Sequence, residues 1–144
     1  MTFYFFDSSV AVKVYYTEVG TDKTKEIYDA LEDGIMISNL TYTEVISALN
    51  RKKQNGLISQ QQFDEALSKF FFDYQNKYLV IDMEEAIRVS AGKLILRQNL
   101  RSADSIQLAT ALDDERLPPI FVCSDEKLCN AATSEGLQVL NPEK

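Results

Sequence analysis

The sequence predicts an α/β fold in which a parallel sheet is covered by helices on both faces. Short apolar runs, typical of strands buried on both faces, recur along the chain. Longer segments with helical spacing of their apolar residues separate these runs, and parallel sheets require this alternation. The 144 residues contain no internal repeat, low-complexity tract or Pro/Gly-rich linker, so we expect a single domain over residues 1–144.

The predicted strands are short runs rich in aromatic and β-branched residues. The first run is followed directly by Asp7-Ser8-Ser9, which is typical of a buried strand that leads into a helix cap. Pro118-Pro119 ends the connection before the fourth run. In chain order we expect strands at residues 3–6, 35–38, 78–81, 120–123 and 138–140.

The predicted helices follow from the spacing of apolar residues and from start and stop signals. Val45, Ala48 and Leu49 share one face of a helix that Asn55-Gly56 ends. Ser59 and Gln62 have the spacing of a capping box at the start of a long helix. We expect helices at residues 10–16, from 21 to about 31, 41–53, 59 to about 74, 84–98, 102–112 and 125–134.

The composition excludes several functions. The chain contains no histidine, which rules out a Ser-His-Asp triad, a Cys-His dyad and an imidazole acid–base pair. The 15 basic and 22 acidic residues give a formal net charge of −7, which argues against broad electrostatic coating of nucleic acid. A nuclease is still allowed, because divalent cations in a carboxylate cluster reverse the local sign.

The cysteines and the apolar runs bear on the cellular compartment. No run approaches the roughly 20 apolar residues of a membrane helix, and the N-terminus lacks the basic and apolar regions of a signal peptide. We therefore expect a cytoplasmic protein outside the membrane, with Cys123 and Cys129 as reduced thiols rather than a disulfide. Two cysteines without a histidine are also too few for a zinc site.

Four acidic residues stand where strands end or helices begin. Asp7 and Asp125 directly follow the first and fourth predicted strands, and Glu44 and Asp104 lie in the first turns of predicted helices. Each acid alone can serve as a helix cap or as a charge at a helix N-terminus. If the second and fourth strands flank the first, however, all four can reach the crevice outside the carboxyl ends of the strands.

Four carboxylates in one crevice require bound cations or raised pKa values. Oxygen ligands without His or Cys favour Mg²⁺ or Mn²⁺. Two such ions roughly 4 Å apart can activate a water and stabilise both oxygens of a phosphodiester displacement. Spacing alone therefore predicts an acidic metal site. Asp82 also follows a strand, so spacing does not decide whether Asp82 belongs to that site.

The segments around the four acids resemble the motifs of the PIN-domain family, and within it the VapC-type toxins of toxin–antitoxin pairs. They agree in order and spacing, so the resemblance covers essentially the whole chain. It implies a three-layer fold with a mostly parallel sheet of strand order 3-2-1-4-5, which places the strand before Asp82 at an edge and removes this acid from the pocket. The segments are FFDSSVAVK (5–13), SNLTYTEV (38–45), LRSADSIQLA (100–109) and FVCSDEKL (121–128).

The resemblance also implies a function, namely metal-dependent endonucleolytic hydrolysis of RNA. The implied catalytic and metal-binding acids are Asp7, Glu44, Asp104 and Asp125. Asp7 and Asp104 would be the central ligands of Mg²⁺ or Mn²⁺, with Ser9 as a supporting hydroxyl near Asp7. The family further implies a cognate antitoxin that holds the toxin inactive, and a homodimer.

One position departs from the family's pattern. Many members carry Thr or Ser two residues before the fourth acid, where this chain has Cys123. Either Ser124 substitutes for that hydroxyl, or a hydrogen bond behind Asp125 is missing.

Three basic residues are candidates for contact with RNA. Lys13 and Arg101 each lie within six residues of a proposed ligand, and Arg51 opens the basic run Arg51-Lys52-Lys53. Each has a simpler alternative: Lys13 and Arg101 can neutralise nearby acids, and the run suits a helix C-terminus.

Two aromatic runs bear on packing and partners. Phe70-Phe71-Phe72 cannot all face one core, because consecutive helical residues are turned by about 100°. We expect two of the three to be buried and the third to be exposed or covered by a dimer mate or an antitoxin helix. For Tyr15-Tyr16 we expect core packing, with partner contact or base stacking as the alternative.

Other functions remain open from the residues alone. A receiver domain or an aspartate-nucleophile phosphatase would share the α/β class. However, Ser9 stands where the phosphatase needs a second acid, and Phe5-Phe6 stands where the receiver needs an acid pair. The other alternative is a catalytically silent PIN-fold protein or RNA-binding module, because activity depends on ligand placement finer than motif spacing.

Overall fold

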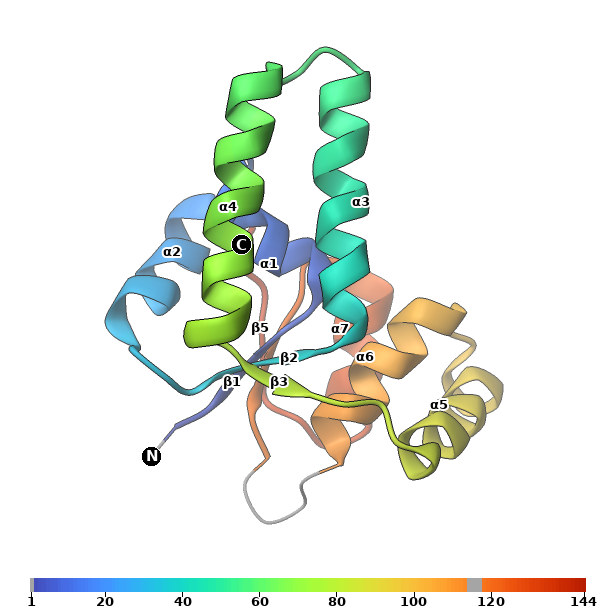
Figure 1. The fold of residues 1–144 in the computed structure, drawn as a ribbon. Coiled ribbons are helices and arrows are strands. Elements are labelled where there is room, and N and C mark those ends of the chain that lie inside the picture. Colours follow the sequence, from blue (N-terminus) through green and yellow to red (C-terminus); the bar gives the residue numbers. More distant parts are fainter. Residues whose placement is uncertain (1, 114–117) are drawn as a thin grey trace.

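Five strands form one sheet, and helices cover both of its faces (Figure 1). The computed structural model describes residues 2–113 and 118–144. Its elements are β1 (Tyr4–Phe6), α1 (Ser8–Tyr15), α2 (Thr21–Ala30), β2 (Ile35–Ser38), α3 (Leu40–Gln54), α4 (Gln60–Asn76), β3 (Leu79–Ile81), α5 (Glu85–Gln98), α6 (Ser102–Leu112), β4 (Ile120–Val122), α7 (Glu126–Ser134) and β5 (Val139–Leu140). No helix in the two described ranges is long and apolar enough to cross a membrane.

The strand order is β3-β2-β1-β4-β5, and every neighbouring pair is parallel. β1 lies at the centre, where Tyr4 pairs with Ile35 of β2 on one side and with Ile120 of β4 on the other. The expected α/β class and the expected order 3-2-1-4-5 are therefore confirmed. The order differs from the 2-1-3-4-5 arrangement of receiver domains, which excludes that fold.

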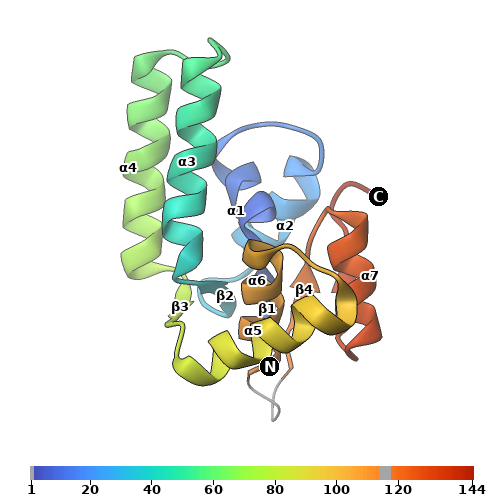
Figure 2. The same cartoon turned by 90° about the vertical axis from the view of Figure 1, so that its right-hand side faces the viewer.

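The two faces of the sheet carry separate apolar cores. Because successive strand residues point to opposite faces, Phe5 and Phe6 belong to different cores. Phe5 stacks on Phe121 of β4 with ring centroids 5.6 Å apart, in the core covered by α5, α6 and α7. Phe6 packs in the other core, against α1, α3 and α4, so the molecule has three layers (Figure 2).

Five helix starts differ from the sequence prediction by one or two residues, and two of these differences involve a proposed site acid. The helix expected from residue 10 begins at Ser8, because Asp7 takes the extended N-cap conformation. The amides of Val10 and Ala11 then bond to the Asp7 carbonyl. The helix expected from residue 125 begins at Glu126, because the carboxylate of Asp125 caps it.

Helices α3 and α4 form a hairpin that projects beyond the sheet (Figure 1). Of the three consecutive phenylalanines on α4, Phe70 is fully buried, Phe71 is 38% exposed and Phe72 is 66% exposed. The expectation that two of them are buried is wrong, because Phe71 lies at the edge of the hairpin and stacks on Tyr42 of α3. Tyr15 and Tyr16 pack against the core as expected.

The buried carboxylate of Asp73, which the sequence analysis did not single out, ties α4 to the first two helices. Its Oδ2 accepts hydrogen bonds of 2.7 Å from the hydroxyls of both Tyr15 on α1 and Tyr28 on α2. The Tyr15 hydroxyl also lies 2.7 Å from the hydroxyl of Tyr78. Every member of this cluster has a partner, which a buried polar group needs to avoid a desolvation penalty.

We expect Asp73→Ala to lower the free energy of unfolding by about 3 kcal/mol, because it removes a buried carboxylate that accepts hydrogen bonds from two half-buried tyrosine hydroxyls. Urea unfolding followed by circular dichroism measures this loss. Asp64→Ala is the matched control, since Asp64 lies on the same helix but is exposed; it should change stability by less than about 0.5 kcal/mol. Equal effects of the two substitutions would contradict the prediction.

Candidate functional site

The acid that follows the central strand lies at the carboxyl edge of the sheet. Asp7 connects β1 to α1, is only 5% exposed, and accepts a hydrogen bond from the Ser9 hydroxyl. The pKa of Asp7 is raised from its ordinary value of 3.8 to about 6, mainly by burial and in part by the charges of Asp104 and Glu44, against the lowering effect of Ser9. Asp7 is therefore held close to two other proposed ligands.

Asp104 joins the same electrostatic group from α6. Burial raises the pKa of its carboxyl, Arg101 opposes the rise, and the charges of Asp125 and Glu44 add to it. Asp7, Glu44 and Asp104 thus affect one another electrostatically, and Asp125 is linked to this group through Asp104. This mutual effect is expected of a carboxylate cluster that lacks a cation.

Glu44 is oriented by two donors from other helices. Its Oε1 accepts a hydrogen bond of 2.6 Å from Ser8 on α1 and one of 2.9 Å from the amide of Gln107 on α6. The sequence analysis missed Gln107. A signal existed, because Gln107 stands three residues after Asp104 and therefore on the same face of its helix.

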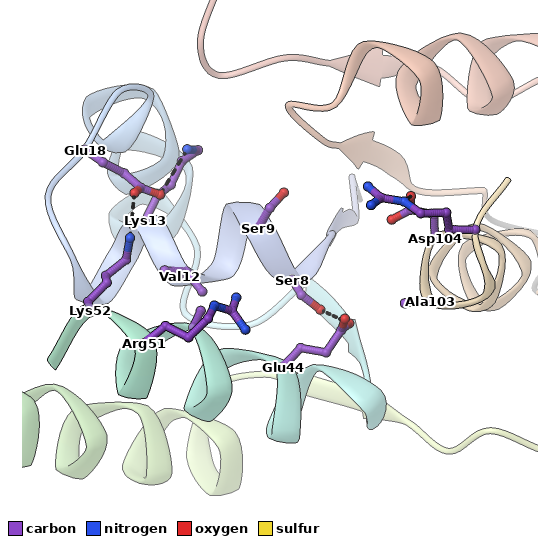
Figure 3. A pocket seen from close by; sticks show the side chains of 12 residues that line it. Ser8, Ser9, Val12, Lys13, Glu18, Glu44, Arg51, Lys52, Ala103 and Asp104 are labelled. Carbon is purple, nitrogen blue, oxygen red and sulfur yellow. Dashed lines mark hydrogen bonds and ion pairs between the residues drawn. The ribbon is translucent and has the colours of Figure 1, made fainter. Parts of the chain in front are cut away.

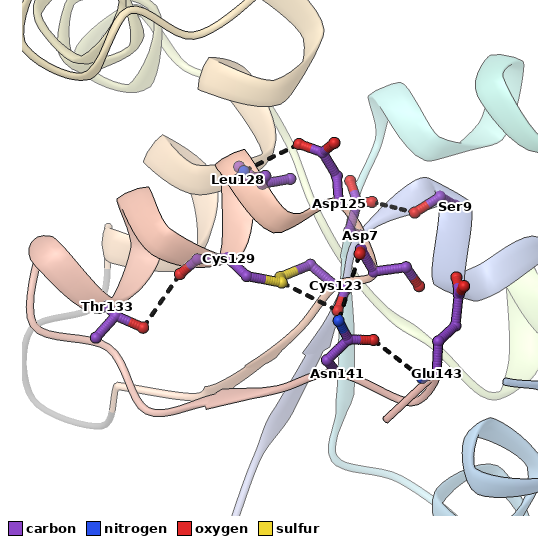
Figure 4. The surroundings of a disulfide bond; sticks show 10 residues. Asp7, Ser9, Cys123, Asp125, Leu128, Cys129, Thr133, Asn141 and Glu143 are labelled. Carbon is purple, nitrogen blue, oxygen red and sulfur yellow. Dashed lines mark hydrogen bonds between the residues drawn. A yellow bond between two sulfur atoms is a disulfide. The ribbon is translucent and has the colours of Figure 1, made fainter.

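Asp125 serves as the N-cap of α7. Its Oδ2 accepts a hydrogen bond of 2.9 Å from the backbone amide of Leu128 (Figure 4). The capping alternative raised from the sequence is thus observed for this acid. Ser124, the proposed supporting residue, stands directly before it, and the Ser124 carbonyl accepts a bond from Asn141.

A pocket of about 530 Å³ opens beside Glu44 and Asp104 (Figure 3), whereas Asp7 and Asp125 are not among the residues that line it. Glu44 from α3 and Asp104 from α6 line it together with Ser8 and Ser9. Asp82 follows the edge strand β3, lies outside this lining, and approaches Asn39 instead. The expected edge position of the strand before Asp82 is confirmed.

The three basic candidates occupy different positions. Lys13 is buried, and its ammonium pairs with Glu18 and Glu143 at 3.2 Å each. Arg101 is 88% exposed at its side chain and lies 3.8 Å from Asp104. Arg51 is exposed. All three residues line the pocket, but the ammonium of Lys13 is paired with two acids that are not among the proposed ligands.

The acids suit Mg²⁺ or Mn²⁺ by donor chemistry, since all are carboxylates and no histidine competes. Across residues 2–113 and 118–144, however, no three Asp, Glu or Cys side chains converge tightly enough to hold an ion. Asp7 is instead held by Ser9, and Asp125 by the start of α7. Metal binding stays a prediction.

The expectation of two reduced thiols is wrong, because Cys123 and Cys129 form a disulfide (Figure 4). The Asp125 cap turns the chain so that the first turns of α7 run back past the end of β4. The two Cα atoms are therefore 6.0 Å apart, a separation that disulfides span. The expectation of reduced thiols rested on the cellular compartment, which does not indicate how close the two cysteines lie in the fold.

Comparison with known proteins gives consistent results. The sequence profile described as "PIN domain" matches residues 4–132. The chain is 27% identical over 139 residues to Ribonuclease VapC45 of Mycobacterium tuberculosis, covering 96% of this chain and 95% of that protein. A toxin–antitoxin complex from Klebsiella pneumoniae has a similar fold, with a TM-score of 0.63 at 21% identity and 96% coverage of both chains. VapC20 of M. tuberculosis, a sarcin-ricin loop cleaving toxin, gives a TM-score of 0.69 at 14% identity, covering 93% of this chain and 95% of that one.

The raised pKa of Asp7 predicts a pH dependence of stability for the metal-free protein. The folded state holds the Asp7 proton up to about pH 6 and the unfolded state only to about 3.8, so stability falls as the pH rises between these values. Asp7→Asn removes this loss and should make the protein more stable at pH 7.5 by about 1–3 kcal/mol.

Urea unfolding in EDTA at pH 4 and pH 7.5 measures the effect. The advantage of Asp7→Asn should shrink at the lower pH. An Asp7→Asn protein that is no more stable than wild type at pH 7.5 would contradict the assigned cause.

Proposed function

Because this chain belongs to the PIN-domain family, we propose that it is a metal-dependent endoribonuclease and the toxin of a VapBC-type toxin–antitoxin pair. The observation that supports this most directly is the group of four acids at the carboxyl edge of the sheet, in which Asp7 and Asp104 have raised pKa values. The ribonuclease name of the relative that spans nearly the whole chain agrees with it. An RNA substrate, a cytoplasmic location, a cognate antitoxin and a homodimer complete the proposal.

Asp7, Glu44, Asp104 and Asp125 would hold Mg²⁺ or Mn²⁺, which supplies a water of lowered pKa and neutralises charge on the phosphate. Ser9 orients the Asp7 carboxylate through its hydrogen bond. Glu44 and Asp104 face the pocket from different helices, so a phosphodiester there would lie between them (Figure 3).

Arg51 and Arg101 provide positive charge in an otherwise acidic protein. A guanidinium can bind a phosphate with two parallel hydrogen bonds. We propose that these two arginines bind the RNA backbone on either side of the cleaved bond. Lys13 supports the pocket wall instead, because its ammonium is already engaged by Glu18 and Glu143.

The alternative is a catalytically silent PIN-fold protein or RNA-binding module. Asp125 favours it to a degree, because its carboxylate is used as a helix cap. The two functions differ in whether a metal-dependent cut is made, so the first experiment must measure cleavage.

We expect the purified protein to cut a cellular RNA pool into discrete fragments in the presence of Mn²⁺ or Mg²⁺ but not in EDTA. We expect Asp104→Asn to keep the fold and to lower the cleavage rate more than a hundredfold. Asp82→Asn is the matched control, because Asp82 also follows a strand but lies outside the pocket. It should cleave like wild type. Near-wild-type activity of Asp104→Asn would overturn the site assignment, and no cleavage by antitoxin-free folded protein would favour the silent module.

We expect Arg51→Ala and Arg101→Ala each to lower kcat/KM for RNA about tenfold, since each removes a charge-assisted hydrogen bond to phosphate. The loss should shrink as salt increases. Arg88→Ala is the control, because Arg88 is also exposed, lies on α5 outside the pocket, and pairs with Glu85 of its own helix. Equal effects of all three substitutions would mean that net charge, not the pocket, governs RNA binding.

A further inference from the structure

Gln107 is a buried amide at the junction of three helices. Its side chain on α6 is 1% exposed. The amide nitrogen lies 2.7 Å from the Ser8 hydroxyl, 3.1 Å from the Thr41 hydroxyl and 2.9 Å from Glu44 Oε1. These partners lie on α1 and α3, so one amide connects the helix that bears Asp104 to the two helices across the pocket.

The donors and acceptors of this junction fix the orientation of the amide. An ionised carboxylate only accepts hydrogen bonds, so the Gln107 NH₂ group must face Glu44. Ser8 also donates to Glu44 Oε1, at 2.6 Å. Two protein donors therefore hold the same carboxylate oxygen, and within the described chain no hydrogen bond engages the second oxygen of Glu44.

The orientation has a cost, since the Gln107 carbonyl oxygen is buried and has no partner among the described residues. An unpaired buried acceptor lowers stability. If the junction only filled space between helices, an apolar side chain of the same length would do so without this cost. The hydrogen bond that the amide nitrogen makes with Glu44 explains better why an amide occupies this position.

We propose that Gln107 is a positioning residue of the metal site: it fixes the Glu44 carboxylate with one oxygen engaged and the other available to a divalent cation. This inference rests on the function proposed above. Because Asp104 and Gln107 share one face of α6, a single helix sets the positions of two acids at once. Residues that orient metal ligands commonly contribute 10–100-fold to metal affinity.

The test is the affinity of the whole metal-free protein for Mn²⁺, measured by isothermal titration calorimetry. Gln107→Met keeps the length of the side chain and removes its donor. Thr110→Val is the matched control, because Thr110 is equally buried one turn further along α6 and its hydroxyl bonds only to the Ile106 carbonyl. Urea unfolding of each variant reports stability separately.

We expect Gln107→Met to bind Mn²⁺ at least tenfold more weakly than wild type and Thr110→Val to bind it normally. Wild-type affinity in Gln107→Met, or equal weakening in both variants, would overturn the inference while the proposed ribonuclease stands. Absence of Mn²⁺ binding by the wild-type protein would overturn the proposed function and this inference with it.

A second pair of variants tests the same inference if Gln107→Met does not fold. Ser8→Ala removes the other donor to Glu44, and Ser105→Ala removes an equally buried hydroxyl that bonds only to the Ser102 carbonyl. Weaker Mn²⁺ binding in Ser8→Ala alone would support positioning of Glu44 by buried donors. Equal Mn²⁺ binding in the two variants would overturn it.

Discussion

The repulsion among carboxylates at the carboxyl end of β1 is the constraint on which the rest of the site depends. Parallel pairing of β1 with both β2 and β4 brings Asp7 to the edge where the other acids gather. Local groups reduce the cost of this charge: Ser9 bonds to Asp7, and Arg101 offsets Asp104. The site is therefore a place where buried charge lowers stability, as is common for functional sites.

Much of the fold could be predicted because buried parallel strands leave a direct trace in sequence. Both neighbours of β1 are short apolar runs, so each strand was found to within about a residue or two. The strand order could not be derived from these runs, since pairing depends on contacts far apart in the chain. It followed from the motif resemblance, which also predicted that the strand before Asp82 lies at an edge of the sheet.

The features that the sequence did not reveal all depend on distant contacts. Gln107 meets Ser8 across 99 residues, and Asp73 meets Tyr15 across 58. The spacing of Gln107 from Asp104 indicates a shared helix face, but it does not show that the amide is buried against two other helices. The disulfide was missed for a related reason: an argument from the expected compartment took no account of how the Asp125 cap folds α7 back past β4.

The central position of β1 also has a consequence for how the chain folds during synthesis. β1 is made first, yet its partner in β4 lies more than a hundred residues later, because Tyr4 pairs with Ile120. Contacts of such long sequence separation form slowly, and parallel pairing cannot be replaced by a local hairpin. A growing chain therefore holds Asp7 on an incomplete sheet until β4 emerges from the ribosome, and Asp125 follows only after that. A chain that terminates before β4 would lack both one neighbour of β1 and Asp125, so the edge of the sheet at which the acids lie would be incomplete.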